Sequence, residues 1–289
     1  MTSRGARVRP FVSKLTVAGG AAALILSLVP SVALAQAVAG PNQGAVSVAG
    51  GLDVPSVYVF RGVVQERTPK LTLFPYADLG VRLSGDSATG RGITLHAGVW
   101  NSLNTGSSGS KGFTAHTHYE EDFYSTLSVG IGSGLTVDAS YTAYTSPNLM
   151  FTTVHEASVK LSSASRFHPY GLAGFDLGSG SLDGGQKKGI YVELGGEPAF
   201  HLGRLLLGVP VKVGLSGSHY YELDGVDHRF GFADAGGRVT LPLTVVPARF
   251  GAWNVHGGAE YLAFGTTTKS LNAGAAHKVV VLGGIGLSY

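Results

Sequence analysis

The sequence predicts an all-β protein, a single closed transmembrane antiparallel β-barrel of about 12 strands. Three observations predict it: regular alternation of apolar and polar residues, a composition rich in glycine and poor in charge, and an aromatic residue at the carboxyl end. Charged residues make up 13% of the chain, and 44 of its 289 residues are glycine. Short alternating segments separated by turn residues are typical of barrels that cross a membrane with strands.

The direction of the alternation separates a membrane barrel from a soluble one. In residues 70–84, Leu79 and Leu83 share one face with other apolar residues, whereas Asp78 and Arg82 lie on the other face. The apolar face of the segments is almost free of charge, and the charges fall on the glycine-rich face. In water this barrel would expose a large apolar belt, so we expect that face to meet lipid. A soluble β-protein is the alternative.

The predicted strands place both ends of the chain on one side, which we expect to be the periplasm. Residues 132–134 are predicted to form a short turn on that side, and residues 104–111 and 176–188 are predicted long outer loops. The seventh strand is the least regular. The predicted strands cover about 46–63, 70–84, 92–102, 118–131, 135–144, 151–161, 167–177, 190–195, 207–216, 233–243, 253–261 and 278–289.

The two ends of the chain indicate export and assembly. Residues 1–35 resemble a cleaved signal peptide, with a basic start, an apolar stretch and the Ala33-Leu34-Ala35 type of cleavage site. A retained membrane anchor is the alternative, but the apolar stretch is shorter than the ~20 residues of a spanning helix. Residues 36–289 are then one barrel domain. Its last strand carries the predicted assembly signal, which the barrel-assembly machinery would read: Ile285, Leu287 and Tyr289.

Charge and composition exclude several functions. The four basic residues of the leader leave 17 of the chain's 21 basic residues against 18 acidic ones, so there is no basic surface that would suit nucleic acid. The chain has no cysteine, which excludes disulfides and thiol catalysis. We expect the outer membrane of a Gram-negative bacterium as its location, with lipid and lipopolysaccharide as partners and no cofactor.

Several motifs in the first half resemble the TorF family of porins. Residues 57–65, Val-Tyr-Val-Phe-Arg-Gly-Val-Val-Gln, are similar to that family's Tyr-x-Phe-Arg-Gly-x-Ser-Gln start, although Val64 replaces the usual serine. Residues 100–102, 120–124 and 141–156 resemble further elements of the family in the same order. The match covers roughly residues 54–162. The resemblance implies an outer-membrane barrel that acts as a channel, without an established substrate or catalytic residues.

The inward face supplies candidate lumen residues. Charges recur four residues apart on one face, as in Asp78 with Arg82, Glu156 with Lys160, and Asp234 with Arg238. Either acids and bases face each other across a constriction that sorts solutes, or they are neutralised pairs that fill a narrow barrel. Outward aromatics are expected to form interfacial girdles: Tyr58, Phe60, Phe123, Tyr141 and Trp253. The candidate lumen-lining residues are Arg61, Trp100, Glu120, Asp122, Tyr144, Glu156, Lys212, Asp234 and Arg238.

Metal and catalytic sites have weaker support. His116, His118, Glu120 and Asp122 alternate along one predicted strand, but at ~3.4 Å per residue they spread too far to hold one ion without neighbouring strands. No G-x-S-x-G motif is present, and we expect no enzyme. The predicted function is a narrow porin-like channel for passive diffusion of small hydrophilic solutes. The alternatives are a closed structural or surface-interaction barrel and an outer-membrane lipid hydrolase.

Overall fold

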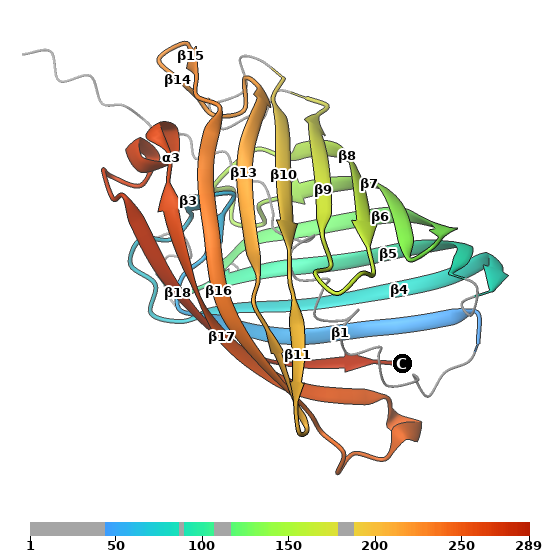
Figure 1. The fold of residues 1–289 in the computed structure, drawn as a ribbon. Helices are drawn as coiled ribbons and strands as arrows, with labels where there is room; N and C mark the ends of the chain where they lie inside the picture. The colour runs from blue at the N-terminus through green and yellow to red at the C-terminus, as the bar shows by residue number, and fades with distance from the viewer. Residues whose placement is uncertain (1–43, 87–89, 107–116, 179–187) are drawn as a thin grey trace, which may run out of the picture.

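A computed structural model describes residues 44–86, 90–106, 117–178 and 188–289. In this part of the chain the strands wrap into a closed antiparallel barrel (Figure 1). None of the helices in the described ranges has the length and apolar character needed to cross a membrane. The barrel strands are β1 (Val46–Pro55), β4 (Thr72–Asp86), β5 (Arg91–Asn104), β6 (His118–Gly132), β7 (Leu135–Thr145), β8 (Val154–Ser163), β9 (Tyr170–Asp176), β10 (Ile190–Gly196), β11 (Ala199–Leu202), β12 (Leu205–Gly208), β13 (Val211–Ser218), β16 (Phe230–Pro242), β17 (Ala252–Phe264) and β18 (His277–Ser288).

Two of these strands are interrupted, so the barrel wall has twelve strands, which confirms the predicted fold class. β10 runs on into β11 and β12 into β13, and the two breaks fall at Pro198 and Pro210, which cannot donate to a ladder. The first and last strands pair with each other, with Ala49 opposite Ser288. The pairing of β16 with β17 completes the circle of the barrel wall.

The alternation places apolar residues outside and polar residues inside. On β6, for example, Phe123, Leu127 and Ile131 point outward and are 40–50% exposed. On the inner face of the same strand, Glu120 and Asp122 are fully buried. A side-chain period of two over a closed sheet produces one apolar outer wall and one polar lumen.

The connections differ between the two ends of the barrel. At the end where β1 begins and β18 finishes, here the terminal end, residues 132–134 form the predicted short turn, with Ser133 and both glycines at positive φ. The opposite end, here the mouth, carries longer connections, including α3 (Thr266–Leu271) and the hairpin of β14 (Glu222–Leu223) and β15 (Val226–Asp227). The short 3-10 helix Ala248–Phe250 lies between β16 and β17. The predicted signal peptide and most of both predicted long loops lie outside the described residues.

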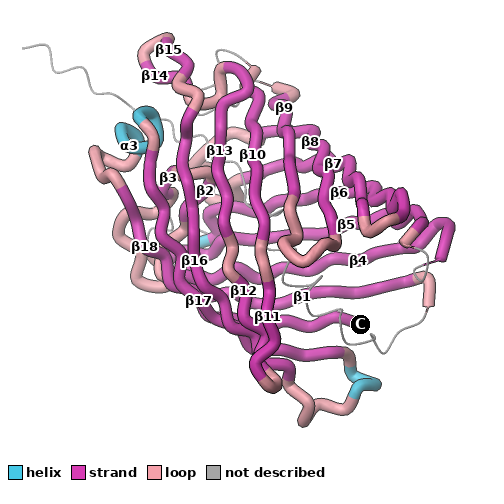
Figure 2. The backbone as a smooth tube through the Cα atoms, in the orientation of Figure 1, coloured by secondary structure: helices cyan, strands magenta, loops and turns pink. Residues whose placement is uncertain are grey.

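The predicted first strand is wrong in its second half. β1 ends at Pro55, and residues 56–71, here the plug segment, leave the wall of the barrel. Within it β2 (Val59–Phe60) and β3 (Val63–Val64) pair as a separate hairpin at the mouth (Figure 2). Arg61 and Gly62 connect them with φ of 42° and 82°, as a two-residue turn of the tight hairpin type requires. The sequence pattern was misleading because Val59, Phe60, Val63 and Val64 have the residue types of a strand.

Candidate functional site: a plugged lumen with a charged cavity

The plug segment is fixed to the barrel by the side chain of Arg61. Its Nη1 donates to Glu156 Oε2 at 2.7 Å and its Nη2 donates to Glu156 Oε1 at 2.9 Å. The guanidinium also lies 3.9 Å from the centre of the Tyr191 ring, and Nη1 donates to the hydroxyl of Tyr220 at 2.9 Å. Burial by itself would lower the pKa of Arg61, but the Glu156 carboxylate outweighs it and keeps that pKa well above its ordinary value. The arginine therefore stays charged and clamps the turn to β8.

Further polar contacts hold the plug segment to the loops of the mouth. Asn272, which follows α3, donates from Nδ2 to the Gly62 carbonyl at 2.7 Å and accepts from the Val64 amide at 2.8 Å. Tyr221 donates to the Arg61 carbonyl at 2.9 Å. Tyr58 donates to Glu120 Oε2 at 2.9 Å, and burial together with this carboxylate raises the pKa of Tyr58 well above its ordinary value. The hydroxyl therefore remains a donor.

Aromatic rings fill the lumen on both sides of the plug segment. One group packs Tyr58 and Phe60 against residues of the β4–β8 wall, including Phe74, Trp100 and Tyr144. The other group lies on the β9–β17 side: Leu172, Tyr191, Tyr220, Tyr221, Phe232, Leu262 and Phe264. The members of both groups are at most 9% exposed. The mouth half of the lumen is thus closed by close packing.

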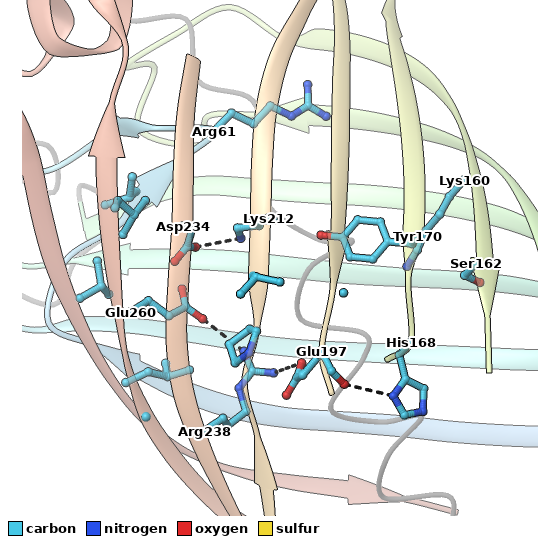
Figure 3. A pocket seen from close by; sticks show the side chains of 18 of the residues that line it. Arg61, Lys160, Ser162, His168, Tyr170, Glu197, Lys212, Asp234, Arg238 and Glu260 are labelled. Atoms are coloured by element: carbon cyan, nitrogen blue, oxygen red, sulfur yellow. Dashed lines mark hydrogen bonds and ion pairs between the residues drawn. The ribbon is translucent and has the colours of Figure 1, made fainter. Parts of the chain in front are cut away.

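Below the plug segment the lumen contains a cavity of ≈ 500 Å³ that is lined by both apolar and charged side chains. Val57, Val59 and Arg61 form its ceiling, and its lining extends to Gly134 and Ala164 in the turns of the terminal end. Its walls carry charges of both signs, seen in Figure 3: Lys160, Glu197, Lys212, Asp234, Arg238 and Glu260.

The charges in this cavity pair between different strands. Lys212 lies 3.4 Å from Asp234. Arg238 reaches Glu197 at 3.3 Å and Glu260 at 3.4 Å, as the dashed lines of Figure 3 show.

The predicted pairs within single strands are therefore wrong. Asp78 is bonded to His96 on the adjacent β5 and to Tyr124 on β6, and Glu156 to Arg61 of the plug segment. Lys160 has its Nζ 4.9 Å from the Tyr170 ring centre instead. Residues four apart on a strand are ~13 Å apart, whereas facing residues on adjacent strands are ~5 Å apart, so the partners come from other strands or from the plug segment.

The predicted lumen residues divide into two groups. Lys212, Asp234 and Arg238 line the cavity. The remaining six surround or belong to the plugged half, where each is at most 5% exposed: Arg61, Trp100, Glu120, Asp122, Tyr144 and Glu156. Arg61 belongs to the plug segment itself rather than to the end of a strand. All nine residues lie on the inner side of the barrel. Of the six residues in the second group, only Arg61 faces the cavity.

The structure corrects two further predictions, the outer aromatic girdle and the common face of His118 and Glu120. Tyr58 and Phe60 are buried in the plug segment, so their assignment to an outer girdle is wrong; Phe123 and Tyr141 do point outward, at 49% and 46% exposed. The predicted common face of His118 and Glu120 is also wrong, because the pairing of β5 with β6 shifts by one residue at this point. His118 bonds the Asn101 side chain at 2.8 Å. His116 lies outside the described residues.

Asn272 and Tyr220 could not be recognised as anchors from the sequence, because they reach the plug segment from loops that no periodicity describes. Glu197 and Glu260 were not among the predicted lumen residues either. A Gly that follows Arg at residue 62, between Phe60 and Val63, is a hairpin signal that could have revealed the plug segment.

No family model and no curated protein matches the chain. The NanC porin structure has 12% identity, covering 84% of this chain and 99% of its own, with a TM-score of 0.38. The translocator domain of the autotransporter NalP from Neisseria meningitidis has 13% identity, covering 91% and 94%, with a TM-score of 0.41. A FadL homologue from Pseudomonas aeruginosa has 8% identity, covering 84% and 88%, with a TM-score of 0.39. Such loose overlaps leave the likeness to the TorF family a resemblance, and the function has to be argued from the geometry.

Proposed function

We propose that the protein is an outer-membrane β-barrel that lets small hydrophilic solutes diffuse through a narrow lumen, and that the plug segment closes its outer mouth. The observation that carries the proposal is the charged cavity of ≈ 500 Å³ directly beneath a plug that belongs to no strand of the barrel wall. A lumen that only had to be filled would not need charged walls around an open space.

The outer wall supports the membrane location. Apolar side chains such as Leu79, Leu95, Val159 and Val281 point outward and are 41–53% exposed. A belt of this kind is costly in water but favourable in lipid, where a closed sheet also leaves no backbone group unpaired. The start of β1 and the end of β18 lie at one end of the barrel, which we assign to the periplasm, so the plug segment would lie at the cell surface.

The way the plug is held supports a closure that can open. Backbone hydrogen bonds to the barrel occur at the two ends of the plug segment, from the Ser56 amide and to the Leu71 carbonyl. Between them the contacts to the wall and loops involve side chains, above all Arg61, Tyr58 and Asn272, and the two short strands pair only with each other. A segment outside the main hydrogen-bond ladder can open with a smaller free energy than the barrel itself. We expect small conductance, because a twelve-stranded barrel has little space after its side chains are placed.

The proposal is tested by removing the plug. Residues 57–70 are replaced by a short Gly-Ser linker, which has only to join two adjacent strands ~4.8 Å apart. The refolded variant should show steady conductance in a planar bilayer, several-fold above the small and infrequent steps of the wild-type chain. Heat-modifiable migration on a gel verifies that both barrels are folded. A folded variant that stays silent would show that the protein is no channel.

A closed structural barrel is the second candidate, and the buried aromatic rings favour it. Trp100, Tyr191 and Phe232 are each 1% exposed, so the mouth is packed as densely as a protein core. If this candidate is correct, the folded protein conducts neither with nor without the plug segment, and its loops carry out its function.

A further inference from the structure

A patch of buried polar atoms without hydrogen-bond partners lies on the inner wall at the mouth. Such atoms are rare in folded proteins, and each one points to an unseen partner such as a water or an ion. In the described residues they concentrate on β4, β5 and β6: Thr72 Oγ1, Trp100 Nε1, Ser102 Oγ, Glu120 Oε1, Asp122 Oδ1 and Asp122 Oδ2.

Strand register brings the central members of this patch together. Ser102 lies directly opposite Glu120, and Trp100 lies directly opposite Asp122. Glu120 and Asp122 are two residues apart and so share the inner face of β6. Facing residues on adjacent strands have Cβ atoms about 4.5–5.5 Å apart. The Ser102 hydroxyl and both carboxyl groups therefore face one enclosed space.

The two carboxyl groups lack a positive partner in the described residues. Both residues are 0% exposed. Glu120 accepts a hydrogen bond from Tyr58, the Glu120 and Asp122 carboxyl groups interact with each other, and Arg61 of the plug segment is bound to Glu156. A buried carboxylate that is neither paired nor hydrogen-bonded costs several kcal/mol. The space must therefore hold a positive charge, either a bound cation or a proton.

We propose that Glu120, Asp122 and Ser102 bind a divalent cation of the Ca²⁺ type behind the plug segment. All the available ligand atoms are oxygens, which Ca²⁺ prefers, and two carboxylates balance its charge. Among the described residues, no group of three or more His, Cys, Asp or Glu side chains is arranged to hold a metal ion, so this site would need the Ser102 hydroxyl and water molecules as further ligands. Trp100, which lies opposite Asp122, has an Nε1 without a hydrogen-bond partner that would be available to a ligand oxygen.

The cation would also act on the plug. Tyr58 of the plug segment donates to Glu120 Oε2, while the free Oε1 of the same carboxylate is available to the cation. An occupied site fixes the carboxylate that Tyr58 contacts and so stabilises the closed mouth. The site itself does not depend on the proposed function, since a structural barrel could bind the ion equally well.

The experiment uses Tb³⁺, which replaces Ca²⁺ and emits when a nearby tryptophan is excited. The chain has two tryptophans, and only Trp100 lies at the site. Because the site is enclosed, the full mature chain is refolded in the presence of Tb³⁺. Unbound Tb³⁺ is then removed. We expect sensitised emission that Ca²⁺ included during refolding suppresses. It should persist in Trp253→Phe and in Asp138→Asn, an inward carboxylate of β7, and disappear in Glu120→Gln/Asp122→Asn.

A second readout covers the case in which the double variant does not fold. Ser102→Ala keeps both charges and should weaken Ca²⁺ binding several-fold. Binding is measured from the Ca²⁺ concentration needed to raise the thermal unfolding temperature, compared between the variant and the wild-type barrel. Absence of sensitised emission from the folded wild-type protein would overturn the proposal. The proposal would also be overturned if the emission and the Ca²⁺ response remained unchanged in the folded variants. The carboxyl groups would then hold a proton instead.

Discussion

The mouth half and the terminal half of the lumen are built on the same strands but are filled differently. In the mouth half, Tyr58, Phe60, Trp100 and Phe232 are at most 1% exposed and leave no passage. In the terminal half, the inner face carries charges and glycines around an open cavity, with Lys212 and Arg238 in its wall. The difference shows that the closure is local: it comes from one inserted segment and the rings around it.

The two halves also differ in how their parts are held. The wall consists of continuous antiparallel ladders, such as the eleven facing residue pairs of β16 and β17 between Phe232 and Pro242. The plug segment is held by a few side chains, of which Arg61 makes the most contacts. The two kinds of attachment should respond differently to substitution, and the predictions below test this difference.

The largest effect is expected from Arg61→Ala. It leaves the Glu156 carboxylate, 2% exposed, without its cation, which costs ~3–5 kcal/mol. Hydrogen exchange should become fast across the plug segment while the strands of the wall keep their protection. Adding Glu156→Gln should restore part of the protection, since the buried charge is removed too. Unchanged exchange of the plug amides would show that Arg61 is not its main anchor.

A second prediction concerns the outer wall, which should be equally apolar in both halves. Leu127 points outward near the middle of β6 and is 40% exposed. Leu127→Lys should lower the free energy of unfolding in liposomes by ~2–4 kcal/mol. The matched control is Thr126→Lys on the inner face, which should cost clearly less. Equal losses for the two lysines in urea titrations would contradict an outer face in lipid.

A smaller effect is expected from Gly62→Ala in the plug turn. Its φ of 82° is unfavourable for any residue with a Cβ, and that Cβ would lie 3.0 Å from Phe232. The left-handed conformation alone costs ~1–2 kcal/mol. The exchange of the plug amides should speed up less than in Arg61→Ala. Gly237→Ala, in the terminal half, has free space around the added Cβ and should leave that exchange unchanged.

The smallest effect is expected for the charges of the terminal half. Lys212 and Asp234 are paired at 3.4 Å in the cavity wall. Lys212→Gln should shift the reversal potential of the plug-deleted barrel toward cation selectivity, and Asp234→Asn should shift it toward anion selectivity. Stability should fall less than in Arg61→Ala, because this pair lines the cavity. Shifts in the same direction for both variants would mean that this wall does not contact the permeating ions.

Most of the barrel could be predicted from the sequence, because a closed sheet between lipid and a polar lumen imposes a period of two on every strand. The strand from Thr72 to Asp86, for instance, is close to the predicted 70–84. The plug segment could not be separated from β1, since Val59, Phe60, Val63 and Val64 have the residue types of a strand wherever they pair.

The site could be predicted only in part. That Arg61, Glu156 and Asp234 point inward follows from alternation. Their partners depend on which residues face each other after the chain has closed into a barrel, and this register is not visible in one strand. His118 is a sharper case, because a single shift of register between β5 and β6 is enough to separate it from Glu120.

The most direct test of a closure by the plug segment is a reversible cross-link. The chain has no cysteine, and the Val64 amide lies 2.8 Å from the Asn272 side chain, so Val64→Cys/Asn272→Cys can lock the plug to the mouth. Conductance is recorded from the same folded preparation before and after reduction. The oxidised barrel should be silent, and reduction should restore openings. Openings of equal size and frequency in the fully cross-linked and reduced protein would contradict closure by this segment.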